Sequence, residues 1–134
     1  MADSIALTGL TEMVNLRYEG NSPDTPDVGD TDAYDTVLLD GNGRKVGTLS
    51  GRGKVAYRRP TDDHVMVHYR EELTLPDGTV AIAGWIDAND IQAGKWVTLD
   101  ARGVDGAYAG WTGVRMLRIK EPHKVMDAAV FLFN

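Results

Sequence analysis

The sequence predicts an all-β protein, an eight-stranded antiparallel β-barrel with a lumen that can hold a ligand. Apolar and polar residues alternate with a period of two along most of the 134 residues, as they do in half-buried strands. Turn-forming residues interrupt this alternation at near-even spacing, and no stretch has a sustained helical period. Because few residues remain for a second layer, a closed barrel, which leaves no exposed sheet edge, is favoured over a sandwich.

The first half of the chain contains three of the predicted strands. A first strand is expected at residues 11–18, and a long loop rich in Pro, Gly and Asp follows it at 19–32. A second strand at 34–40 ends in Gly41-Asn42-Gly43, where Asn-Gly supplies the positive φ angles of a hairpin turn. The third strand, at 45–59, contains glycines that predict a bulge or a sharp bend, namely Gly47, Gly51 and Gly53.

The second half of the chain contains the clearest hairpin and three further strands. Residues 65–75 and 79–87 alternate in polarity, and Pro76-Asp77-Gly78 forms the turn between them. A glycine-rich connection is expected at 103–113. Around it lie the sixth, seventh and eighth strands, at residues 95–100, 114–121 and 125–133. All eight strands are expected to belong to one domain, residues 1–134.

The charge distribution argues against several classes of partner. There are 14 basic and 20 acidic side chains, a net charge of −6, and no Lys or Arg lies between Tyr18 and Gly43. A chain without a basic stripe is a poor partner for nucleic acid or for an anionic membrane. The absence of cysteine fits a reducing compartment, and the N-terminus lacks the basic and apolar regions of a signal peptide. We therefore expect a cytoplasmic protein that binds neither nucleic acid nor membrane.

The familiar catalytic and metal-binding patterns do not occur in the sequence. All three histidines are expected on the surface, with His64 and His123 in turns and His68 on the outer face of a strand. The aspartates between residues 24 and 32 lack the register and the closing glutamate of an EF-hand loop, so no metal is expected. No nucleophile elbow or phosphate-binding glycine loop is present. Two classes remain: a binder of a lipophilic small molecule, and an enzyme that works by shape.

One predicted strand places polar side chains inside the barrel. In residues 65–75 the odd-numbered residues are mostly apolar and the even-numbered ones mostly polar, so the odd face is expected to point inward. Tyr69 and Glu71 then lie in the lumen, where a phenol and a carboxylate need partners. Two interpretations stay open: both are satisfied polar groups of the core, or the Tyr69 hydroxyl donates a hydrogen bond to a carbonyl of a ligand.

A set of short motifs is shared with a known family. They occur in order between about residue 11 and residue 119, and their combined spacing is more specific than any one of them. They are Thr11-Glu12, Tyr57-Arg58-Arg59-Pro60-Thr61-Asp62, Tyr69 with Glu71, Leu75-Pro76-Asp77-Gly78, Gly84-Trp85, Asn89-Asp90, Lys95-Trp96-Val97, Gly103-Val104, and Tyr108-Ala109-Gly110-Trp111-Thr112-Gly113 followed by Arg115. In these residues the chain resembles the small β-barrel spirotetronate cyclases, natural Diels-Alderases of polyketide antibiotic pathways.

The resemblance implies a barrel related to allene oxide cyclase, usually a homodimer, that uses no cofactor and no metal. It implies an intramolecular [4+2] cycloaddition, in which a diene of a linear polyketide adds to the exocyclic methylene of a tetronate or tetramate ring. It also implies that the loop at about 19–31 caps the lumen. Such a reaction moves no proton and needs no nucleophile, and it gains from the positioning of its reacting groups. A non-catalytic barrel that carries a lipophilic polyketide intermediate remains the alternative.

The resemblance also implies roles for particular residues. Tyr69 matches the tyrosine that donates a hydrogen bond to the ring carbonyl of the substrate. Glu12 and Arg115 match a gating salt bridge across the barrel mouth, where the pair acts either as a gate or as a structural staple. Leu99 and Leu117 stand where family members have aromatic residues, which implies a wider and less aromatic pocket. The residues implied to bind substrate are Tyr34, Val67, Glu71, Leu99, Leu117 and Trp111.

Overall fold

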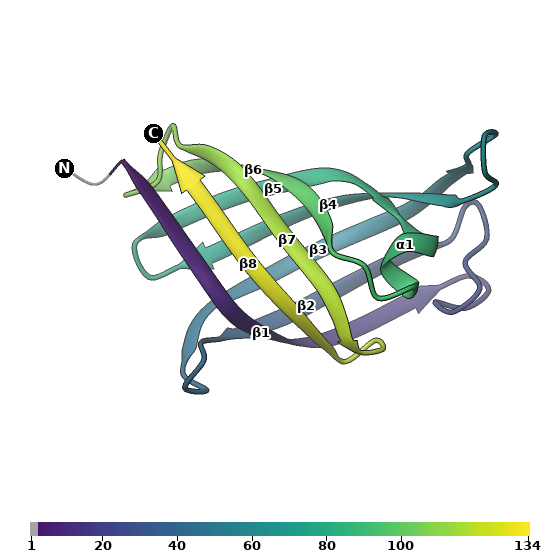
Figure 1. Cartoon of the computed structure of the whole chain (residues 1–134), viewed down its shortest axis with the longest axis horizontal. Coiled ribbons are helices and arrows are strands. Elements are labelled where there is room, and N and C mark those ends of the chain that lie inside the picture. Colours follow the sequence, from purple (N-terminus) through teal and green to yellow (C-terminus); the bar gives the residue numbers. More distant parts are fainter. Residues whose placement is uncertain (1–2) are drawn as a thin grey trace.

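The computed structural model describes residues 3–134 as a closed antiparallel β-barrel with one short helix (Figure 1). Its strands are β1 (Ser4–Glu19), β2 (Thr31–Leu39), β3 (Lys45–Arg58), β4 (Val65–Leu75), β5 (Gly78–Asp87), β6 (Val97–Gly106), β7 (Thr112–Glu121) and β8 (Val125–Phe133), and its helix is α1 (Ala88–Gln92). Each strand pairs with the next, and β8 pairs with β1 to close the barrel. The predicted eight-stranded antiparallel barrel is confirmed. Among these residues, no helix is long and apolar enough to cross a membrane.

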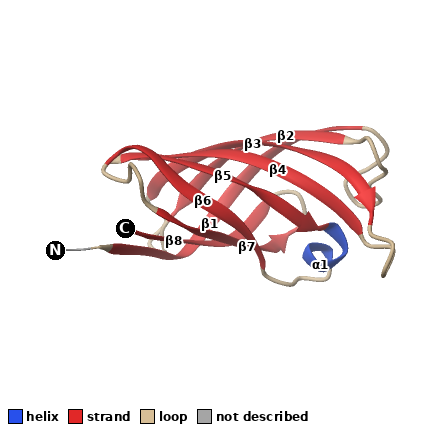
Figure 2. Cartoon of the chain, turned by 90° about the horizontal axis from the view of Figure 1, so that it is seen from above, coloured by secondary structure: helices blue, strands red, loops and turns tan. Residues whose placement is uncertain are grey.

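The two ends of the barrel are built differently. The long β1–β2 loop and α1 lie at the end opposite to both chain termini (Figures 1 and 2). The β3–β4 and β7–β8 turns also belong to that end, because antiparallel strands place every second connection on the same side. At the other end the strands are joined by short turns. The loop-bearing end is therefore the one where an opening to the interior is expected.

β1 is longer than the alternation of the sequence predicts, because it begins at Ser4 rather than at residue 11. Its first part pairs with β8, with Ser4 opposite Phe133. The register then shifts between Leu7 and Leu10, where Gly9 has a φ of +62°. This bulge changes which residues point inward, from odd-numbered before it to even-numbered after it. A pattern with a fixed period of two therefore misses the first part of the strand.

β6 is also longer than expected and reaches Gly106, so the predicted connection at 103–113 is wrong in its first part. Gly103 pairs with Val80 of β5 as a strand residue. A Cβ at Gly103 would lie 1.7 Å from the backbone oxygen of Tyr108 in the turn before β7. The glycine thus allows that turn to fold closely onto the strand instead of ending it.

The sequence pattern does not predict α1, because five residues are too few to show a helical period. The helix depends instead on a cap. Asp87 at the end of β5 accepts a hydrogen bond at 3.0 Å on its Oδ1 from the backbone N–H of Asp90. The helix therefore starts where β5 stops, at the loop-bearing end of the barrel.

The interior of the barrel is divided along its length. The half near the chain termini is filled with apolar side chains, which include Leu10, Leu38, Leu49, Leu73, Leu75, Val80, Ile82, Leu99, Val130 and Leu132. In β4 the odd-numbered residues point inward, as predicted. Met66 on the outer face is also buried, at 7% exposure. It pairs with Tyr57 beside a bulge in β3. The other half of the interior is hollow.

Candidate active site

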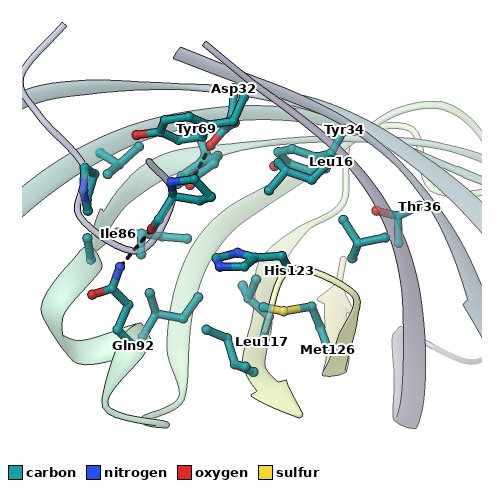
Figure 3. A pocket seen from close by; sticks show the side chains of 18 of the residues that line it. Leu16, Asp32, Tyr34, Thr36, Tyr69, Ile86, Gln92, Leu117, His123 and Met126 are labelled. Atoms are coloured by element: carbon teal, nitrogen blue, oxygen red, sulfur yellow. Dashed lines mark hydrogen bonds between the residues drawn. The ribbon is translucent and has the colours of Figure 1, made fainter. Parts of the chain in front are cut away.

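A cavity of about 160 Å³ occupies the half of the barrel beneath the β1–β2 loop (Figure 3). Pro23 and Pro26 of the loop cover it, and α1 and the β7–β8 turn lie at its rim. Its apolar lining consists of Val14, Leu16, Val55, Val67, Ile86, Ala88, Ile91, Leu117, Ile119 and Met126. Cavities for drug-sized ligands measure about 300 to 1,000 Å³. The covered cavity is therefore smaller than the space that a drug-sized ligand occupies.

The floor of the cavity is a buried cluster of three charged side chains. Arg115 of β7 donates hydrogen bonds to Glu71 of β4 through Nε at 2.6 Å and to Glu12 of β1 through Nη2 at 2.9 Å. All three side chains are only 1% exposed. Burial alone would lower the pKa of Arg115, but its two carboxylate partners outweigh burial and raise it. Arg115 is therefore a permanent cation whose charge is already matched by the two glutamates.

The position of this cluster corrects the expectation of a gating salt bridge. Glu12 and Arg115 do pair, but they lie at the bottom of the cavity and not at its mouth. Along β1 the lining residues run from Glu12 through Val14 and Leu16 to Tyr18, and Tyr18 is the one next to the loop. The pair therefore lies between the hollow half of the barrel and the packed half, at the floor rather than at the entrance.

Two tyrosines form one wall of the cavity. Tyr34 of β2 donates a very short hydrogen bond to Glu71, and Tyr69 of β4 donates one to Oδ2 of Asp32 at 3.2 Å. The ring centroids lie 6.0 Å apart with the planes tilted by 60°. This geometry is typical of aromatic pairs in protein interiors. The two hydroxyls thus point toward carboxylates on opposite sides of the ring pair.

Glycines of β3 make room for these two rings. A Cβ at Gly51 would lie 2.5 Å from Cζ of Tyr34, and a Cβ at Gly53 would lie 2.5 Å from Cε1 of Tyr69. Both distances are far shorter than normal carbon contacts. Gly51 and Gly53, from which the sequence predicts a bend, therefore leave space for the tyrosines. Each ring packs directly against the backbone of β3.

The pKa values of the two tyrosines and of Asp32 are raised in the wall of the cavity. Burial raises the pKa of the Tyr69 phenol well above its ordinary value, and the carboxylate of Asp32 raises it further. Burial likewise raises the pKa of Tyr34, with Glu71 adding to the shift. Both phenols therefore keep their protons and act as hydrogen-bond donors. Burial also raises the pKa of Asp32, which opposes the effect of the hydrogen bond from Tyr69.

Asp30 anchors the base of the loop over the cavity. One of its oxygens, Oδ2, accepts hydrogen bonds from Tyr18 Oη at 2.7 Å and from the backbone N–H groups of Asn21 at 3.1 Å and Asp27 at 3.0 Å. These donors lower the pKa of Asp30, the backbone of Asp27 most strongly. Gly20 packs against this carboxyl so closely that a Cβ there would overlap it. The acidic loop therefore has an ordered base rather than a purely solvated chain.

The tip of the loop is held on the far rim by two contacts. Gln92 of α1 donates a hydrogen bond from Nε2 to the backbone oxygen of Pro23 at 3.1 Å. His123 of the β7–β8 turn contacts Oδ1 of Asp24 through Nε2 at 2.7 Å. Gln92 and His123 also line the cavity (Figure 3). We call these two contacts the latch, because they join the loop to the opposite side of the opening.

The residues implied by the resemblance are only partly brought together. Seven of them line the cavity, namely Glu12, Tyr34, Val67, Tyr69, Glu71, Arg115 and Leu117. Leu99 does not, because it lies in the packed half of the barrel at 1% exposure. Trp111 does not either, because it packs edge-on against Tyr108 at the other end, with ring centroids 6.1 Å apart. The polar lining residues that sequence reasoning missed are Tyr18, Asp32, Thr36, Gln92 and His123.

One side-chain cluster outside the cavity has the spacing of a metal site. Asp62, His64 and Asp87 place their ligand atoms within 4.8 Å of one another. Arg59, however, donates hydrogen bonds to Asp62 at 2.5 Å and to Asp87 at 2.7 Å. A guanidinium therefore already supplies the positive charge that a cation would bring, and the cluster ties the β3–β4 turn to the start of α1.

The geometry described above defines a class, a closed β-barrel with a capped internal cavity. Residues 12–132 match the model of the allene oxide cyclase barrel like domain, and the chain belongs to this family. The expectation of a barrel related to allene oxide cyclase is thus confirmed.

Three solved structures within this class are similar to the chain. The first is a nonspecific heme-binding cyclase that catalyses [4+2] cycloaddition during neoabyssomicin biosynthesis (36% identity, TM-score 0.91, covering 100% of this chain and 65% of that one). The second is the Diels-Alderase AbmU from Streptomyces koyangensis (37% identity, TM-score 0.88, 96% and 63%). The third is AbnU, an exo-specific intermolecular Diels-Alderase (32% identity, TM-score 0.91, 98% and 97%). The chain thus spans about two thirds of the length of the first two.

Proposed function

We propose that the protein is a cyclase that catalyses a [4+2] cycloaddition in polyketide biosynthesis. The observation that supports this most is the capped, largely apolar cavity, with a phenol donor in its wall, in a barrel that is similar to Diels-Alderases along its whole length. The cavity offers no serine, cysteine or metal-ligand set that would suit another reaction class among the residues that line it. A pericyclic reaction needs none of these groups.

The mechanism that we propose is the folding of a flexible substrate into its reactive shape. Holding the diene next to the dienophile removes part of the entropic barrier, with about 7 to 11 kcal/mol as the limit for ideal positioning. The apolar walls, with Val67 and Leu117 among them, suit the hydrocarbon part of such a substrate. A hydrogen bond from Tyr69 to a carbonyl conjugated with the dienophile withdraws electron density, and it strengthens as charge builds on that oxygen.

The substrate that we propose is a linear polyketide in which a tethered diene adds to the exocyclic methylene of a tetronate ring, forming a spirotetronate. A tetramate is the nearest variant. The reaction is intramolecular in this proposal, whereas AbnU is an intermolecular enzyme. We propose further that the enzyme works in the cytoplasm as a homodimer, and that it needs no cofactor because the bonds rearrange without a redox step.

A second candidate is a carrier that binds a lipophilic polyketide without converting it. The latch favours this candidate, because a covered cavity can protect a ligand from water as well as fold it. A carrier is expected to bind the linear polyketide tightly and to release it unchanged, whereas the cyclase is expected to release a product of the same mass.

The experiment that tests the proposal is incubation of the purified protein with a linear tetronate bearing an exocyclic methylene and a tethered diene. Liquid chromatography with ultraviolet and mass detection follows the substrate, beside a reaction without protein. We expect faster loss of the diene absorbance at unchanged mass. Tight binding at the uncatalysed rate would instead identify a carrier. A wild-type protein that neither binds nor converts the tetronate or the matching tetramate would contradict the proposal.

A further inference from the structure

The hydroxyl proton of Tyr69 is already engaged in the structure. Tyr69 has one proton to donate, and Oδ2 of Asp32 accepts it at 3.2 Å. A phenol that donates to a carboxylate has no second proton for a substrate carbonyl. The proposed function therefore requires that something releases this proton from Asp32, and the surroundings of Asp32 show what can do so.

Asp32 lies in a place that suits an uncharged carboxyl group. Within residues 3–134, its Oδ1 is buried and has no hydrogen-bond partner. This oxygen lies close to the backbone of Gly53, because a Cβ added to that glycine would be 2.9 Å from it. The titratable groups that face Asp32 are Tyr18 of β1, Tyr69 and Glu71 of β4, and, across the cavity, His123 of the β7–β8 turn. The cation beyond Glu71 is Arg115, which is fully used by Glu12 and Glu71.

The hydroxyl of Tyr69 and the backbone N–H of Gly53 favour the ionised form of Asp32, but burial outweighs them and raises its pKa. An ionised Asp32 also has a buried oxygen without a well-formed hydrogen bond and a negative neighbour in Glu71. Both conditions favour the protonated form of a carboxyl group. When protonated on Oδ2, Asp32 can donate to the oxygen of Tyr69, because that oxygen has lone pairs free to accept. The phenol proton is then free to point elsewhere, and the open side of the tyrosine faces the cavity.

We propose that Asp32 is a positioning residue which, once protonated, donates a hydrogen bond to Tyr69 and so turns the tyrosine hydroxyl toward the carbonyl of the substrate. This inference rests on the proposed cycloaddition. It describes a chain of two hydrogen bonds, from carboxyl to phenol and from phenol to carbonyl. Each bond in such a chain polarises the next, so the donor that meets the substrate is stronger than a phenol alone.

The inference gives the activity a pH dependence with a definite sign. The protonated form of Asp32 is the active one, so kcat/KM falls as the pH rises through the pKa of Asp32. Burial raises this pKa, so the decline lies above the range of an ordinary aspartate. Asparagine cannot ionise, and its amide nitrogen donates a hydrogen bond as the protonated carboxyl does. Asp32→Asn is therefore expected to keep its activity where the wild type loses it.

The first experiment measures kcat/KM against pH for the wild type, for Asp32→Asn and for Asp35→Asn. Asp35 is the matched control, because it lies on the outer face of β2 and pairs only with Arg17 at the surface. We expect the wild type and Asp35→Asn to lose about tenfold across the transition, the usual effect of one hydrogen bond, while Asp32→Asn stays flat. A folded Asp32→Asn variant that retains the transition, or is inactive throughout, would overturn the inference.

The second experiment needs no substrate. The carboxyl carbon of Asp32 is titrated by NMR in the wild type and in Tyr69→Phe. Loss of the phenol donor removes the contact that lowers the pKa of Asp32, so this pKa should rise in the variant. An unchanged titration would show that the pair is not coupled and would overturn the inference. If the wild type converts no substrate but the titration shifts, the proposed function fails and the coupling of the pair stands.

Discussion

At the scale of single residues, the proposed chemistry of the cavity depends on one phenol, Tyr69. We predict that Tyr69→Phe lowers kcat by about tenfold, because the lost hydrogen bond is one that strengthens in the transition state. The fold should persist, since the phenylalanine ring can still pack against the backbone of Gly53. Steady-state kinetics and a thermal unfolding curve check both parts. Tyr57→Phe is the control, because this exposed tyrosine lies on the outer face beside Trp85. Equal rates in both variants would contradict the role of Tyr69.

The charged floor gives a prediction about stability. Arg115→Met leaves Glu12 and Glu71 buried without a cation, and we expect the free energy of unfolding to fall by about 3 to 5 kcal/mol. The triple variant Glu12→Gln, Arg115→Met, Glu71→Gln should recover most of this loss, since it leaves no charge behind. Urea unfolding measures both. A single variant as stable as the wild type would show that the cluster is not needed to hold the floor.

The sequence predicts the site residues that lie in clearly alternating strands and misses those that lie in a turn or a loop-like segment. Tyr69 and Glu71 lie in a strand with clear alternation, so their inward direction follows from parity alone. Asp32 belongs to a series of aspartates in a segment that reads as a loop, and only its hydrogen bond with Tyr69 and its place in the lining show that it faces the cavity. His123 reaches the cavity from a turn, where no periodicity exists to indicate direction.

At the scale of elements, the β1–β2 loop covers the cavity. We predict that Gln92→Ala and His123→Ala each raise the dissociation rate of a bound product or unreactive analogue by about twofold to fivefold, because each removes one exposed contact of the latch. Stopped-flow measurements give these rates. His68→Ala is the control, since His68 packs edge-on against Trp85 on the outer face of the barrel. Unchanged dissociation in both latch variants would show that the loop opens independently of them.

The base of the same loop gives a prediction that depends on pH. The pKa of Asp30 is lowered in the folded loop, so this carboxylate stabilises the loop above its ordinary pKa and loses the effect as the pH falls through the lower, folded value. We expect Asp30→Ala to increase proteolysis and hydrogen exchange of residues 20–29 at neutral pH. Asp27→Ala removes the same charge from an exposed side chain and should change neither. Equal loss of protection in both variants would show that charge, not the anchor, orders the loop.

The elements that the sequence predicts least well are those in which a local contact overrides the pattern. The first part of β1 is missed because the bulge at Gly9 reverses its parity. The end of β6 is missed because Gly103 looks like a loop residue and is in fact a point of close backbone approach. The helix α1 is missed because it needs only the cap from Asp87. The remaining strands follow their alternation within a few residues.

At the scale of the whole molecule, the barrel separates stability from substrate binding. We predict that Leu99→Ala lowers the free energy of unfolding by about 2 to 5 kcal/mol without a change in KM, because Leu99 fills the packed half. Leu117→Ala enlarges the cavity instead and should shift the preference toward bulkier substrates. Chemical unfolding and KM for two substrates of different bulk measure this contrast. A change in KM for Leu99→Ala as large as that for Leu117→Ala would contradict the division.

The closed barrel could be predicted because strand number and spacing are visible in the sequence, but the division of its interior could not. Leu99 and Leu117 are both inward-facing leucines on neighbouring strands, and nothing in their types distinguishes them. The register places Leu99 opposite Arg115 and Leu117 opposite Val97, which sets their depths along the barrel. Depth decides which leucine meets a ligand, and it depends on pairings between strands that a single sequence does not specify.

The close packing of the two tyrosine rings on Gly51 and Gly53 has a consequence for how the cavities of such barrels change shape in evolution. One added carbon at either position would push a tyrosine ring toward the centre of the cavity and so reshape the bound substrate. These positions lie behind the tyrosines and do not line the cavity themselves. Changes in the facial selectivity of a cycloaddition can therefore originate at residues outside the contact shell, and a search for selectivity determinants in related enzymes should include the backbone of β3.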